Sequence, residues 1–133
     1  LQRYRQFFDY DRSGNLQRIE HVAGRGAFIN AWTRTLSYAA NANRLTASTV
    51  GGAPAEHFAY DVHGNTTTMP HLAALDWDED NRLIRVRNHA GDRVWYAYDG
   101  EGNRVRKFVE HPDGSTEDRI YVGRWERIEH RRA

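Results

Sequence analysis

Residues 98–104 read YDGEGNR, and this stretch decides how the chain is expected to fold. Asp99 and Gly102 stand at the first and fourth positions of a four-residue turn, where Asp bonds backbone N–H groups ahead of it and Gly tolerates positive φ. A type I turn followed by a left-handed glycine is a common β-hairpin connection. Tyr98 ends the incoming strand, and Asn103 can bond back across the turn. The stretch therefore predicts strand, tight turn, strand.

The same motif recurs along the chain. The other full copies are Tyr10-Asp11-Arg12-Ser13-Gly14-Asn15 and Tyr60-Asp61-Val62-His63-Gly64-Asn65. Trp77, Asp78 and Asn81 belong to WDEDNRL at 77–83, interpreted as a variant one residue shorter and without the glycine. Residues 38–45 are a weaker copy that lacks the Asp. The repeat asparagines, at 15, 43, 65, 81 and 103, give the irregular spacing of a stacked-repeat architecture.

Between the turns, apolar and polar residues alternate with the period of two that is typical of strands. From residue 83 onward the pattern predicts antiparallel strands at about 83–87, 93–98, 103–110 and 116–122, with a terminal strand at about 116–130. Residues 23–36 fit a loop, a longer hairpin or a helical turn. Residues 46–56 predict a surface loop. Pro70 should end or bulge the run at 66–69, and LAAL at 72–75 is a weak helix candidate. The predicted fold is all-β, an antiparallel, twisted and curved sheet of hairpins.

The composition excludes several classes of protein. The chain has 133 residues with 19 basic and 18 acidic side chains, and this balance disfavours a dedicated nucleic-acid binder. The absence of cysteine rules out disulfides, Cys-ligated zinc and Cys nucleophiles. No apolar run approaches the roughly 20 residues of a membrane-spanning helix. The 16 aromatic residues supply material for a core.

The three YDxxGN copies, with the WDEDNRL and ANRL variants, resemble the YD-repeat family, also called the rearrangement-hotspot (Rhs) repeats. Residues 119–130, RIYVGRWERIEH, resemble the strand that follows the last repeats of this family. The family includes bacterial polymorphic toxins, the C component of insecticidal toxin complexes and teneurin-like cell-surface proteins. The resemblance implies a β-sheet coiled into a hollow shell that, in the toxins, encloses a C-terminal toxin domain.

The resemblance also implies a setting for the chain. Residues 1–133 are expected to be a single YD-repeat segment of a larger bacterial protein that is secreted or displayed at the cell surface. Its expected partners are neighbouring YD repeats and the C-terminal toxin domain, with no nucleic acid and no membrane span. Exposed strand edges could also pair copies of the segment into a homo-oligomer.

No enzyme is expected. An Asp-Pro motif associated with self-cleavage usually follows the repeats in this family, and none of the three prolines here follows an Asp. We therefore carry over no catalytic residue, and we assign no metal and no cofactor. The acidic residues at 76, 78, 79 and 80 lack the glycine and glutamate of a calcium loop. The histidines form no metal-binding pair.

Two surface features keep a binding function open as the alternative. Six arginines could line one face and attract phosphate or an acidic glycan: Arg82, Arg85, Arg87, Arg93, Arg104 and Arg106. Cross-strand pairs with nearby Asp92, Glu101, Glu110 and Glu117 would explain them equally well. The aromatic residues could likewise form a sugar-stacking surface, or each ring could pack on the turn of a neighbouring repeat. The alternative function is thus a cell-surface or glycan-binding interaction module.

Overall fold

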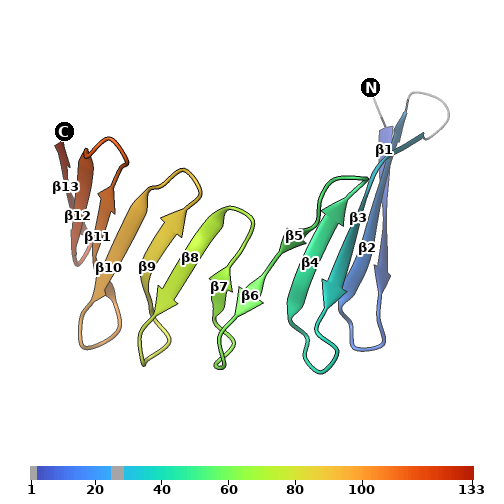
Figure 1. Cartoon of the computed structure of the whole chain (residues 1–133), viewed down its shortest axis with the longest axis horizontal. Coiled ribbons are helices and arrows are strands. Elements are labelled where there is room, and N and C mark those ends of the chain that lie inside the picture. The colour runs from blue at the N-terminus through green and yellow to red at the C-terminus, as the bar shows by residue number, and fades with distance from the viewer. Residues whose placement is uncertain (1–2, 25–28) are drawn as a thin grey trace. The chain divides into compact units, whose positions relative to one another are not determined.

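The computed structural model describes residues 3–24 and 29–133, and every regular element in these residues is a β-strand. The chain forms two compact units, Leu1–Phe58 and Ala59–Ala133. Within each sheet, neighbouring strands pair antiparallel (Figure 1). The predicted all-β fold of antiparallel hairpins is confirmed. In the described part of the chain, no helix has the length and apolar character needed to cross a membrane.

The first unit is a sheet whose strands follow one another in chain order. Its described strands are β1 (Arg3–Tyr10), β2 (Leu16–Gly24), β3 (Ile29–Tyr38), β4 (Leu45–Val50) and β5 (Glu56–His57). β1 is an edge strand, and all eight of its residues are exposed. Rings from three adjacent strands stack on one face, with Tyr4 5.5 Å from His21 and His21 5.1 Å from Trp32.

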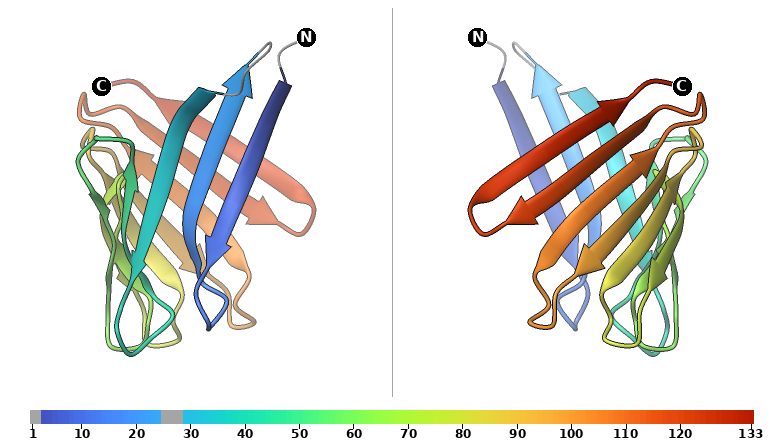
Figure 2. Two further views of the ribbon diagram at one scale, coloured as in Figure 1. Left: turned by 90° about the vertical axis from the view of Figure 1, so that its right-hand side faces the viewer. Right: turned by 90° about the vertical axis from the view of Figure 1, so that its left-hand side faces the viewer.

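The second unit consists of a hairpin and a larger sheet. The hairpin pairs β6 (Ala59–Tyr60) with β7 (Thr66–Thr68). The sheet contains β8 (Leu72–Trp77), β9 (Leu83–Asn88), β10 (Arg93–Tyr98), β11 (Arg104–Glu110), β12 (Thr116–Val122) and β13 (Trp125–Arg131). Figure 2 shows these strands side by side in one layer. β8 and β13 are the edges of this sheet.

An aliphatic row forms the core of the second unit. Leu75 opposes Val86, Val86 opposes Val94, and Val94 opposes Val109 across β8 to β11. Directly opposed residues point to the same face of a sheet. Leu75, Val86 and Val109 are 6–8% exposed, and among the described residues the one other buried apolar side chain is Val22 of β2. The layers therefore bury little apolar surface.

Each repeat turn is followed by a β-bulge on the outgoing strand. Tyr98 opposes Arg104 but Ala97 opposes Arg106, which leaves Val105 unpaired. The same register shift follows the turns that begin at residues 10, 38, 60 and 77. A bulge bends its strand and increases the local twist. The repeats therefore build twisted sheets, as predicted.

The strands predicted from residue 83 to 122 are confirmed, and β7 ends before Pro70 as expected. Of the alternatives left open at 23–36, the hairpin is correct, because residues 29–36 belong to β3, which pairs with β2. Residues 25–28 lie outside the described residues.

Three sequence predictions are wrong in whole or in part. The surface loop expected at 46–56 is limited to the exposed residues 51–55. Residues 46–50 belong to β4, because its small residues pair on both sides and buried Ser48 accepts a hydrogen bond from Arg34 (Nη1–Oγ 2.9 Å). The weak helix at 72–75 belongs to β8, where pairing with β9 buries Leu75. The single strand expected at about 116–130 is the hairpin β12–β13, which turns at Gly123 with φ 57°.

Candidate functional site: the repeat turns

The turn after Tyr98 is held together by the carboxylate of Asp99. Its Oδ1 accepts the backbone N–H groups of Glu101 (2.9 Å) and Asn103 (2.8 Å), and its Oδ2 accepts Asn103 Nδ2 (3.2 Å). Two backbone bonds close the loop, from Asp99 N to Asn103 O (3.0 Å) and from Gly102 N to Asp99 O (3.1 Å). Gly102 has φ 84°, a conformation that glycine adopts at no steric cost.

The other two full copies have the same geometry. Each aspartate accepts two backbone N–H groups and one asparagine side chain, and each glycine has positive φ. The contacts are Asp11 with Ser13 N (2.8 Å), Asn15 N (2.9 Å) and Asn15 Nδ2 (2.9 Å), and Asp61 with His63 N (2.9 Å), Asn65 N (2.9 Å) and Asn65 Nδ2 (3.0 Å). Gly14 and Gly64 have φ 86° and 95°. We call this arrangement the aspartate-centred turn.

These contacts favour the charged form of each carboxylate. The side chain of Asn15 and the turn's backbone N–H groups hold the pKa of Asp11 below its ordinary value. The backbone N–H and side chain of Asn103 do the same for the pKa of Asp99. At Asp61 burial pushes the pKa upward, but the hydrogen bonds of its turn outweigh that effect and lower it. The carboxylates therefore act as hydrogen-bond acceptors that organise the backbone, not as proton donors.

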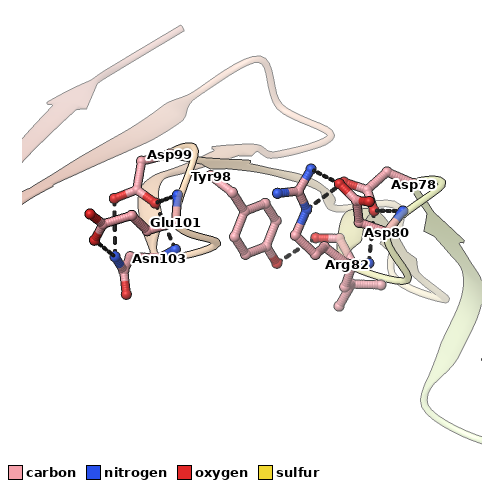
Figure 3. A network of polar contacts seen from close by, with 8 residues as sticks. Asp78, Asp80, Arg82, Tyr98, Asp99, Glu101 and Asn103 are labelled. Carbon is pink, nitrogen blue, oxygen red and sulfur yellow. Dashed lines mark hydrogen bonds and ion pairs between the residues drawn. The ribbon is translucent and has the colours of Figure 1, made fainter.

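The variant at 77–83 has the full length of the motif, so its interpretation as one residue shorter is wrong. Asn81 occupies the glycine position, with φ 60° and its N–H bonded to Asp78 O (3.0 Å). Arg82 occupies the asparagine position, and its backbone N and Nε each lie 2.8 Å from the Asp78 carboxylate (Figure 3). Asparagine tolerates the left-handed conformation, so Asn81 can stand where the other copies have glycine.

The weaker copy at 38–45 keeps the backbone pattern in a longer loop. Ala39 N bonds Arg44 O (2.9 Å), which is one residue further along than in the other copies. Ala39 stands at the position of the aspartate, so this turn has no carboxylate at its centre. Asn43 instead accepts a hydrogen bond from Asn15 Nδ2 (3.0 Å) in the preceding turn. Asn81 Oδ1 accepts Asn65 Nδ2 (2.7 Å) in the same way.

The aromatic residue that opens a repeat reaches back to the preceding one. The bonds are Tyr98 Oη to Leu83 O (2.8 Å), Trp77 Nε1 to Thr66 O (2.8 Å) and Tyr38 Oη to Leu16 O (3.0 Å). Each accepting residue is the strand partner of the preceding repeat's aromatic residue. The guanidinium of Arg82 also lies 5.5 Å from the centroid of the Tyr98 ring. The aromatic positions thus couple consecutive turns, which matches the packing alternative.

Most of the six arginines have partners on the sheet. Arg106 makes two bonds to Asp118 (2.8 and 2.6 Å), and Arg85 pairs with Asp76 (2.6 Å). Arg93 is 3.9 Å from Glu110, whereas Arg104 lies over the rings of Tyr96 (5.5 Å) and Tyr121 (5.0 Å). Of the carboxylates expected as partners, Asp92 instead pairs with His111 (Oδ1–Nδ1 2.8 Å) and Glu117 with Arg119 (2.5 Å).

The acidic residues at 76–80 are engaged within the protein. Asp76 pairs with Arg85 (2.6 Å), while Asp78 and Asp80 both pair with Arg82 (2.8 and 2.9 Å). In the residues that the structure describes, no three His, Asp or Glu side chains gather as a set of metal ligands. The chemistry of this region is that of turns and ion pairs.

Comparison with known proteins identifies the repeat. The RHS Repeat family model matches residues 77–116. No curated protein sequence matches the chain significantly. A crystal structure of TcdB2-TccC3 aligns with 86% of this chain at a TM-score of 0.69 and 14% identity. A crystal structure of TcdB2-TccC3-TEV aligns with 98% at a TM-score of 0.70 and 24% identity.

A structure of a Photorhabdus luminescens Tc holotoxin pore gives the same values, a TM-score of 0.70 with 24% identity over 98% of this chain. The chain spans only 6–7% of the length of the chains it matches in these structures. The similarity therefore concerns the fold of a short stretch. The chain carries an RHS repeat at residues 77–116, and its resemblance to the YD-repeat family is confirmed.

Proposed function

We propose that this chain is a wall segment, a structural and non-catalytic part of an Rhs shell. In this proposal the shell encloses the C-terminal toxin domain of a longer bacterial protein and helps to deliver it. The observation that carries the proposal is the aspartate-centred turn, repeated with the same hydrogen bonds at Asp11, Asp61, Asp78 and Asp99. The match to the RHS Repeat model and the fold similarity to Tc toxin structures support it.

The layer structure suits a wall. A single sheet satisfies its backbone hydrogen bonds from strand to strand, so it can enclose a volume without a second layer. β1, β5, β8 and β13 are the edges of the two larger sheets in the described chain, and further YD repeats would complete the edges at β1 and β13. In this arrangement residues 1–133 act as one YD-repeat segment. The segment then shares the secreted or cell-surface location of its parent protein.

The first test is to translate the coding sequence on both sides of this segment. Further YD repeats upstream, and an Asp-Pro motif with an unrelated domain downstream, are expected. Stop codons close to either end would refute the wall proposal.

In the longer protein, the C-terminal domain should then resist a protease that cuts the same domain expressed alone. Replacing Asp61, Asp78 and Asp99 together by Ala should open the wall and restore cleavage. The matched control replaces exposed Asp9, Glu79 and Glu101, which removes the same number of charges without removing the carboxylate at the centre of a turn. Cleavage of the domain in the unaltered protein would contradict enclosure.

The isolated segment offers a second, cheaper test. Exposed edges should pair copies of it, so light scattering is expected to give a mass that rises with concentration. Phe7→Lys, on edge strand β1, should lower that mass, because charge on an edge opposes pairing. A monomer mass that does not change with concentration would refute edge pairing.

A further inference from the structure

The face of the second sheet opposite the aliphatic row carries an arginine pair that the salt bridges do not account for. Arg87 of β9 and Arg93 of β10 are direct cross-strand partners. Like charges placed directly opposite each other destabilise a strand pair. Among the described residues, no carboxylate lies within ion-pair distance of Arg87, and the one near Arg93 is Glu110 at 3.9 Å. The two arginines therefore carry more positive charge than the single nearby carboxylate offsets.

A shallow depression of about 370 Å³ surrounds this pair. Three arginines and one carboxylate line it: Arg85, Arg87, Arg93 and Asp76. The carboxylate of Asp76 already forms an ion pair with Arg85 at 2.6 Å. Trp95 also lines the depression, two residues beyond Arg93 on the same face of β10. The depression thus combines a net positive charge with an indole ring, and its volume lies at the lower end of the range for small-ligand sites.

We infer that this depression binds an acidic sugar residue of a glycan. A carboxylate placed between Arg87 and Arg93 accepts hydrogen bonds from both guanidinium groups, which match its planar geometry. The apolar face of the attached pyranose ring then packs against Trp95. The ligand removes the repulsion between the two arginines, so binding stabilises a strand pair that is strained when free. A lone phosphate would satisfy the arginines but would make no use of the indole, whose ring centroid lies 5.7 Å from that of Phe108.

The test uses trigalacturonic acid as the probe and its methyl ester as the neutral control, titrated into the full chain by calorimetry. The free acid is expected to bind, more weakly as salt is raised, and the ester is not. Arg87→Gln should weaken binding at least about tenfold, which corresponds to the loss of a hydrogen bond between charged groups. Arg124→Gln, which removes an arginine from the β12–β13 turn, should leave the affinity unchanged.

Thermal unfolding distinguishes a role of Arg87 in ligand binding from a role in stabilising the fold. Arg87→Gln relieves repulsion, so it should hold or raise the unfolding temperature while binding falls. Three results would overturn the inference: no binding of the acid, equal losses in Arg87→Gln and Arg124→Gln, or equal binding of hexaglutamate. The last result would mean that the depression recognises acidic peptides and not sugars.

Discussion

Asn81, the left-handed residue of the turn at 77–83, gives a quantitative test of whether backbone conformation is what this position of the repeat requires. Asn81 has φ 60° and accepts a hydrogen bond from Asn65 Nδ2 at 2.7 Å. Asn81→Ala keeps a Cβ in that conformation but loses the local polar contacts that let asparagine tolerate it, at a cost of about 0.5–1 kcal/mol, and an exposed hydrogen bond adds about 0.5 kcal/mol. The expected loss is therefore about 1–1.5 kcal/mol. Asn81→Gly loses the same bond but relieves the backbone, so its net change is expected to stay within about 0.5 kcal/mol of zero.

The two variants are compared by thermal unfolding followed with circular dichroism. For a chain of 133 residues, each kcal/mol shifts the unfolding temperature by about 3–4 °C, so the alanine and glycine variants should differ measurably. Asn41→Ala is the matched control, because Asn41 is exposed and its φ is not positive, and it should change little. Equal unfolding temperatures for Asn81→Ala and Asn81→Gly would show that the backbone conformation is not what this position provides.

Three further predictions concern an aromatic residue that links two turns, a core valine and a turn aspartate. Tyr98→Phe removes the bond to the preceding turn and should cost about 1 kcal/mol in urea unfolding, whereas Tyr10→Phe, at an exposed ring, should cost nothing measurable. Val86→Ala should cost about 2 kcal/mol because Val86 is 6% exposed, and Val62→Ala, at 90% exposure, is its control. The pKa of Asp99 in the folded protein lies below its ordinary value of 3.8. The stability that this carboxylate contributes is therefore fully present above pH 3.8, and it is lost as the pH falls through the pKa of the folded state. The decline in unfolding temperature on acidification should therefore be shallower in Asp99→Asn, and an unchanged decline would contradict the role of the carboxylate.

Much of the fold could be predicted because each turn is stabilised by residues within the turn itself. The YDxxGN spacing defines the loop, since Asp99 and Gly102 each meet a local requirement that no distant residue changes. The alternation in β10 then fixes which side chains share a face, and Val94 does oppose both Val86 and Val109. Local sequence patterns of this kind predict the folded structure correctly because the tertiary contacts favour the same conformations.

The parts that could not be predicted depend on partners distant in sequence. Small residues at 46–50 suggest a loop until β3 and β5 pair with them on both sides. The partner of Arg106 is Asp118 across a hairpin, and register decides that choice more than proximity along the chain. The hairpin at Gly123 did carry a local signal, a glycine between two strand-like runs. The resemblance of residues 119–130 to a single terminal strand hid that signal.

The irregular spacing of the repeats follows from how the turns are coupled. Each aspartate-centred turn closes its own hydrogen bonds, so its geometry does not depend on the length of the strands that leave it. Consecutive turns are coupled by few bonds, such as the one from Tyr98 to Leu83 O and the one from Asn65 to Asn81. The strands that leave the repeat turns can therefore range from the three residues of β7 to the nine of β2 while the turns keep their geometry. What recurs along this chain is a set of contacts, and a fixed period is not required to build antiparallel sheets from it.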